Sequence, residues 1–124
     1  MTLDWRVKRI AKNETSFRDI NERLEAGLRQ VRHTPERLEF ICECGDRECE
    51  SSVHVSFEEY EAVRADSRRF IVVPGHVFPE TERVVSGNDR YEVVEKFGEA
   101  VEVTDASDRR SPGITGRRSD STSP

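Results

Sequence analysis

The stretch FICECGDRECESSVHV, residues 40–55, contains all three cysteines of the chain. A structural zinc site takes four nitrogen or sulfur ligands in a tetrahedron. The spacing C-x-C-x4-C supplies three of them, because Gly45 permits a sharp reversal that returns Cys49 towards Cys42 and Cys44. The stretch therefore predicts a zinc-knuckle-like loop that requires one further ligand.

Alternating side chains predict that this loop closes a β-hairpin. Apolar residues or cysteines occupy every second position before the loop (Leu38, Phe40, Cys42, Cys44) and after it (Val53, Val55, Phe57). Such alternation is typical of strands with one face in the core. We expect the intervening residues Glu39, Ile41 and Glu43 to face the opposite way.

The fourth ligand should be one of the three histidines of the chain. His33 lies in a polar turn. His54 alternates out of phase with the apolar positions of its strand, so it should point away from the core. His76 follows a short apolar strand on a Pro-Gly bend that can aim its imidazole sideways. We predict a Cys42, Cys44, Cys49 and His76 site, with His54 as the alternative fourth ligand.

An N-terminal amphipathic helix should precede the hairpin, within residues 1–35. Its apolar stripe, over roughly residues 5–31, has helical spacing (Ile10, Phe17, Ile20, Leu24, Leu28, Val31). Pro35 then breaks the helix. The stripe favours packing on the chain's own domain, with pairing to a second copy as the alternative.

The remaining segments predict an α+β fold. Ser56 and Glu59 form a capping box that begins one short helix. Two to three antiparallel strands should follow, drawn from the segment 70–73 and the two sides of the turn SGND (86–89), with one further short strand near Val101–Val103 as an option. We expect a small metal-stapled α+β domain over 36–103 and a disordered tail over 104–124, where Ser, Gly, Pro, Asp and Arg dominate.

Composition is consistent with a stapled domain. The chain has 124 residues, of which 34% are hydrophobic and 36% charged, so its core is thin and would benefit from a metal. Residues 1–35 hold 8 basic and 5 acidic side chains, whereas residues 36–103 hold 8 and 17. The acidic centre disfavours general nucleic-acid binding.

Targeting signals are absent from the sequence as given. It has no apolar run long enough for a transmembrane helix and no signal-peptide pattern. We therefore expect a cytoplasmic protein without membrane attachment. An odd number of cysteines in a reducing compartment also disfavours a disulfide framework.

Catalytic patterns are also missing. The sequence has neither H-E-x-x-H nor a phosphate-binding glycine loop, and a Cys3His site leaves no open position for a reacting water. We expect no enzymatic activity. Zinc is the predicted metal, although thiolates also suit iron, and redox-active thiols or inert buried cysteines are the alternatives.

Three further segments carry a family resemblance: FICECGDREC (40–49), FEEYEAVRADSRRFIVVPGH (57–76) and YEVVEKFGEA (91–100). Together they resemble a family of small, uncharacterised bacterial proteins, mostly from high-GC Gram-positive lineages, with a CxCG…C loop, an EYExVR helix and a PGH motif. The resemblance covers roughly residues 10–105 and implies that His76 belongs to the shared pattern, whereas His54 lies at a variable position. An acidic residue often follows PGH in that family, where this chain has Val77. The resemblance implies no activity.

These observations predict a small zinc-binding module with an interaction or regulatory role. The N-terminal helix, with its apolar stripe and basic surplus, should contact a protein partner or a second copy. A thiol/zinc redox sensor is the first alternative. The second is a DNA-associated regulator using the basic helix with the pairs Arg109–Arg110 and Arg117–Arg118.

Overall fold

A computed structural model of the chain describes residues 3–106 and residue 108. Its elements, in chain order, are α1 (Leu3–Leu28), β1 (Leu38–Ile41), β2 (Ser52–Val55), α2 (Phe57–Arg64), β3 (Arg69–Val72), β4 (Glu82–Gly87), β5 (Glu92–Lys96) and α3 (Ala100–Ala106). All strand pairs are antiparallel. The predicted α+β class is therefore confirmed.

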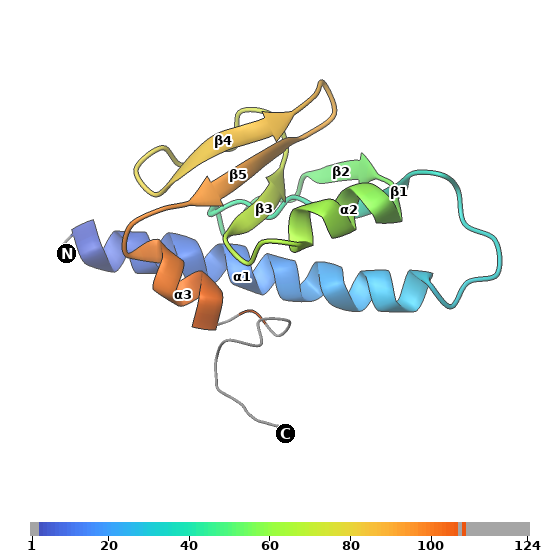
Figure 1. Ribbon diagram of the computed structural model, residues 1–124, viewed down its shortest axis with the longest axis horizontal. Helices are drawn as coiled ribbons and strands as arrows, with labels where there is room; N and C mark the ends of the chain where they lie inside the picture. Colours follow the sequence, from blue (N-terminus) through green and yellow to red (C-terminus); the bar gives the residue numbers. More distant parts are fainter. Residues whose placement is uncertain (1–2, 107, 109–124) are drawn as a thin grey trace.

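The strands form two small sheets on one side of α1 (Figure 1). In the first sheet, β1 pairs with β2 around the cysteine loop, with Phe40 opposite Val53. The second sheet has the order β3-β5-β4, and a register irregularity lies between Val84 and Ser86 in β4. The hairpin predicted at the cysteine loop is present, and the two sheets meet where β1 and β3 run on into their loops.

Helix α2 begins at the predicted capping box. The Ser56 hydroxyl accepts a hydrogen bond from the Glu59 backbone N–H at 3.1 Å, and the Glu59 carboxylate accepts one from the Ser56 N–H at 2.9 Å. These two bonds satisfy donors that a helix start otherwise leaves free. Tyr60 and Val63 then pack on the hairpin, where the Tyr60 ring stacks on Phe40 at 4.6 Å.

The segment around Val101–Val103 is helical, so the strand predicted there is wrong. Gly98, at φ +66°, turns the chain out of β5, and α3 then lays Ala100 against Val7 and Ala11 of α1. Packing on α1 thus overrides the strand preference of the two valines. Thr104, where we expected the tail to begin, is fully buried in α3. Positions 107 and 109–124, most of the predicted tail, lie outside the described residues.

Helix α1 packs on its own domain, but only part of the predicted apolar stripe faces the core. Leu24 and Leu28 contact the main core, whereas Ile20 and Val31 are 46% and 52% exposed. The buried face instead carries a row of polar side chains at helical spacing, Glu14, Arg18, Asn21 and Glu25. Three of these polar groups find partners on distant elements: Glu14 pairs with Lys96, Arg18 donates to two backbone carbonyls, and Asn21 binds Ile41 and Glu43. Glu25 instead binds Arg29, one turn further along the chain.

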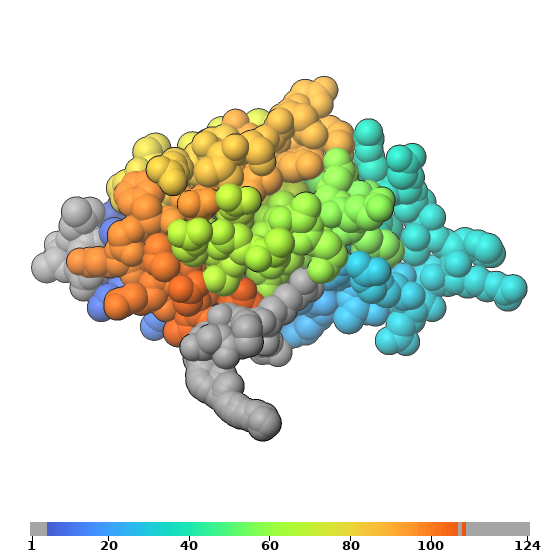
Figure 2. Space-filling model, in the orientation of Figure 1, coloured from blue at the N-terminus to red at the C-terminus, as the bar shows by residue number. Residues whose placement is uncertain are grey.

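Two ionic clusters hold α1 in place. Lys96 of β5 lies 2.5 Å from a Glu14 carboxylate oxygen and 2.8 Å from Glu82. Arg64 of α2 binds Glu22 at 2.6 Å and Asp108 at 2.7 Å. Buried charges are retained in this way only when they are paired. In the space-filling view, α2 and α3 cover much of α1 on this face (Figure 2).

The apolar interior consists of separate clusters. The largest joins the hairpin, α2, β3 and β5 around Phe40, Tyr60 and Ile71. A second places Cys42 and Cys44 against Phe70, Val72 and Val94. The cysteine loop is therefore part of the core.

Candidate metal centre

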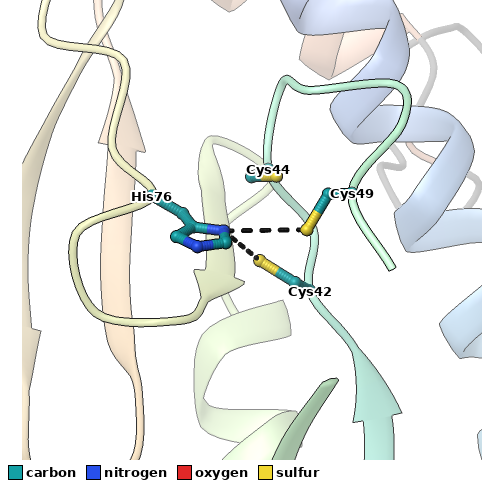
Figure 3. Close-up of side chains that lie close together, drawn as sticks. All are labelled: Cys42, Cys44, Cys49 and His76. Carbon is teal, nitrogen blue, oxygen red and sulfur yellow. Dashed lines mark hydrogen bonds between the residues drawn. The ribbon is translucent and has the colours of Figure 1, made fainter. Parts of the chain in front are cut away.

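Cys42, Cys44, Cys49 and His76 meet at one point. Their donor atoms, one from each residue, all lie within 4.8 Å of one another, so the group could hold a metal ion. The His76 Nδ1 atom lies 3.5 Å from the Cys42 sulfur and 3.6 Å from the Cys49 sulfur (Figure 3). Cys42 and Cys44 are 1% exposed, whereas Cys49 and His76 are half-buried.

Two loops position these four side chains. Cys42 and Cys44 continue β1 on its core side, and a turn closed by the Cys49 N–H bond to the Asp46 carbonyl, at 3.0 Å, returns the third sulfur. His76 lies on the turn after β3, which Gly75 permits at φ +91° and the His76 N–H closes onto the Val73 carbonyl at 3.0 Å. The group therefore connects the first sheet to the second.

The other two histidines lie elsewhere. His54 is exposed on β2, opposite Glu39, and His33 is exposed in the turn between α1 and β1. The alternation of side chains thus correctly predicted that His54 lies on the face of β2 turned away from the core. Of the three histidines, the structure brings His76 to the cysteines.

Two of the donor separations have the length that a tetrahedral zinc site requires. With Zn–S near 2.3 Å and Zn–N near 2.05 Å, a tetrahedron separates nitrogen and sulfur by about 3.5 Å. The two N···S distances of 3.5 and 3.6 Å match that separation. Three sulfurs and one imidazole nitrogen are also the donor set of many structural zinc sites.

Two of the thiols have pKa values shifted in opposite directions. The hydrogen bond to Cys44, together with burial, raises the pKa of Cys42. The same hydrogen bond lowers the pKa of Cys44 to about 5, with further lowering from the Asp46 carbonyl contact and from His76. A lowered pKa favours the thiolate form of Cys44, which is the form that binds a metal ion.

Sequence analysis missed Glu43, which lies between two of the cysteines. We expected it to face away from the core, but it is fully buried, and burial raises its pKa. Its carboxylate accepts hydrogen bonds from Asn21 at 2.8 Å, from the Tyr60 hydroxyl at 2.7 Å and from the Ile71 N–H at 3.1 Å. The face opposite the core meets α1 at this point, and no local pattern in the sequence indicates that contact.

Comparison of the chain with family models, with curated proteins and with solved structures found no match. The fold and the site are therefore interpreted from their own geometry. Within the described residues, no helix has both the length and the apolar character needed to cross a membrane.

Proposed function

We propose that this protein is a small zinc-binding module in which Cys42, Cys44, Cys49 and His76 hold one structural ion, and that its role is interaction or regulation. The observation that carries the proposal is the convergence of four donors from two loops within 4.8 Å of one another, with two N···S distances of 3.5 and 3.6 Å. An ion held there fixes the hairpin to the turn after β3. In a domain whose apolar core is divided into small clusters, such a link contributes directly to folding.

The donor set favours a structural role over a catalytic one. A catalytic zinc keeps a coordination position for water, whereas three cysteines and one histidine fill the tetrahedron. Two of the cysteines are also buried against Phe70 and Val72. We therefore infer that the protein is not an enzyme.

Elemental analysis of the purified protein tests the metal. We expect one zinc per chain in the unaltered protein, and a loss of most of it in Cys49→Ser and in His76→Ala. His54→Ala is the matched control, because His54 is exposed on β2, and it should keep its zinc. Iron in place of zinc would change the metal but keep the site. Full metal content in His76→Ala would refute the proposed four-ligand site.

A redox sensor is a second candidate, favoured by the accessibility of one ligand. Cys49 is half-buried, unlike the other two cysteines, so an oxidant can reach its sulfur first. Mild peroxide should then release zinc, and a thiol reductant with added zinc should restore it. A purely structural site would keep its metal under the same treatment.

The DNA-associated alternative has less support. Of the basic residues in α1, Arg18 is buried and Arg6 binds Glu80 at 2.5 Å, so neither is available to a phosphate backbone. The pairs Arg109–Arg110 and Arg117–Arg118 lie outside the described residues. We propose a protein partner instead, engaged through α1.

A further inference from the structure

A groove runs between the first half of α1 and the cysteine loop. Its volume is about 640 Å³, and its walls include Trp5, Arg9 and Ile10 of α1, Gly45 and Arg47 of the cysteine loop, and Phe78 from the segment after His76. Sites for bound molecules commonly have volumes of this size. Both loops that carry the metal ligands therefore also form walls of this groove.

Close contacts attach the cysteine loop to α1 at the base of the groove. Gly45 lies so near α1 that a Cβ there would be 2.4 Å from the Ile10 side chain. The Asn13 side-chain amide donates a hydrogen bond of 2.9 Å to the Gly45 carbonyl. Any displacement of the cysteine loop would therefore alter the shape of the groove.

The groove continues along α1 into a second hollow. This hollow, of about 300 Å³, shares Asn13 and Arg47 with the first and extends to Phe17 and Ile20. From Trp5 to Ile20, at 1.5 Å per residue, the two hollows follow about 22 Å of helix. An extended chain of about seven residues covers that length at 3.3 Å per residue. The dimensions thus fit a peptide segment better than a compact small molecule.

The surface of the groove combines cationic and apolar groups. Arg9 lies over the Trp5 ring at 5.1 Å, which leaves its N–H donors available. Among the residues that the structure describes, neither Arg9 nor Arg47 has a carboxylate partner. Trp5 and Ile20 are 42% and 46% exposed. Two acidic residues, Asp46 and Glu48, also line the groove, and the Asp46 carboxylate accepts the Glu48 N–H at 2.9 Å.

We propose that this groove binds an extended acidic segment of a partner protein, with an apolar side chain of that segment placed against Trp5 and Phe78. Carboxylates of the segment would bind the guanidinium N–H groups of Arg9 and Arg47, which favour paired carboxylate contacts. Residues 109–124 of this chain are a poor occupant, because they contain four arginines and one aspartate. The inference rests on the proposed zinc module, since the metal fixes two of the walls.

A display library of random heptapeptides, selected on the zinc-loaded full-length protein, tests this proposal. We expect the enriched peptides to be rich in Asp and Glu and to contain at least one aromatic or aliphatic residue. Trp5 is the only tryptophan of the chain, so its fluorescence reports the binding of a synthesised enriched peptide directly. Enrichment of basic or uncharged peptides would overturn the proposal.

Reversing the charge of the two arginines tests whether the peptide binds in this groove. The double variant Arg9→Glu/Arg47→Glu should weaken the affinity for the enriched peptide by about tenfold or more. The matched control, Arg32→Glu/Arg37→Glu, changes the same charge at exposed positions in the loop between α1 and β1 and should bind as the unaltered protein does. Equal affinity in both double variants would overturn the proposal. A second result would also overturn it. If the unaltered protein forms a dimer and Arg9→Glu/Arg47→Glu abolishes that dimer, the occupant of the groove is a second copy of the chain.

Zinc content, measured on the same preparations, separates this proposal from the previous one. Cys49→Ser should lose both zinc and peptide affinity, whereas Arg9→Glu/Arg47→Glu should lose only the affinity. If the protein holds zinc but selects no acidic peptide, only the proposal of peptide binding in the groove is refuted. If the protein selects acidic peptides without holding zinc, the proposed zinc site is refuted and the proposal of peptide binding stands.

Discussion

Gly45 and Gly27 provide a matched test of how tightly the cysteine loop packs on α1. A Cβ at Gly45 would lie 2.4 Å from the Ile10 side chain, whereas one at Gly27 meets nothing within 4 Å. Gly45→Ala should therefore lower the free energy of unfolding by about 1–3 kcal/mol, through overpacking. Gly27→Ala, in a helix, should raise it by up to about 1 kcal/mol. Urea unfolding measures both.

A double-mutant cycle identifies the cause of the Gly45 effect. If the clash with Ile10 is responsible, Ile10→Ala should reduce the additional cost of Gly45→Ala, because the opposing side chain has been shortened. Strictly additive losses would place the cause elsewhere in the loop.

Glu43 shows that a single buried carboxylate can organise several elements. It accepts hydrogen bonds from Asn21 of α1, Tyr60 of α2 and Ile71 of β3. Glu43→Ala removes the acceptor of all three bonds, although Asn21 keeps its bond to the Ile41 carbonyl, and should lower the free energy of unfolding by about 3 kcal/mol or more. Tyr60→Phe should cost about 1–2 kcal/mol, because the other two bonds remain.

The control for Glu43 lies on β1, just before the cysteine loop. Glu39 is exposed, and its carboxylate accepts a hydrogen bond from the Ser52 hydroxyl at the surface. Glu39→Ala should change stability by no more than about 0.5 kcal/mol. Chemical denaturation of the three variants would contradict this account if Glu43→Ala were as stable as Glu39→Ala.

Elements defined by local patterns were predictable, and those defined by distant contacts were not. Alternation is a property of neighbouring residues, so it predicted β1 and β2 and the phase that separates His54 from the core. The capping box of α2 is equally local. In contrast, α3 and the buried face of α1 depend on partners far along the chain. Glu14 resembles a solvated residue until the fold places Lys96 beside it.

The contact between α1 and β5 should make stability depend on pH. Burial is the largest cause that raises the pKa of Glu14, followed by the neighbouring Glu82, while Lys96 lowers it. A carboxyl group with a raised pKa in the folded state binds protons more tightly there than in the unfolded chain. The free energy of unfolding should therefore fall as pH rises from the unfolded pKa through the folded one. Urea unfolding between pH 5 and 8 would show this fall, and Glu14→Gln should reduce it.

Lys96→Met tests the same contact from the other side. Without the ammonium group, Glu14 and Glu82 face each other in a buried place with no cation beside them. The loss of stability should be about 3–5 kcal/mol. It should be larger at pH 8 than at pH 5, where one carboxyl group can take up a proton. A loss independent of pH would show that Lys96 contributes through packing alone.

At the scale of the whole molecule, the group of three cysteines and His76 joins the two sheets at a point adjacent to Glu43. The Glu43 N–H donates to the Ile71 carbonyl at 2.8 Å, next to the position at which His76 meets Cys42 and Cys49. A hairpin of two short strands is not stable alone, and three strands are marginal without a covering layer. The stability of each sheet therefore depends on its attachment to the other.

Removal of the metal should accordingly destabilise the whole domain. Binding of zinc to such a site contributes on the order of 10 kcal/mol, comparable to the entire stability of a small domain. We expect excess chelator to lower the thermal midpoint by more than about 15 °C, and one equivalent of zinc to restore it. In the zinc-loaded protein His76→Ala should lower the midpoint strongly, while in the chelated protein it should have little effect, because the imidazole acts through the ion. A similar loss in both states would mean that His76 stabilises the domain through packing, and equal midpoints with and without chelator would mean that no metal joins the sheets.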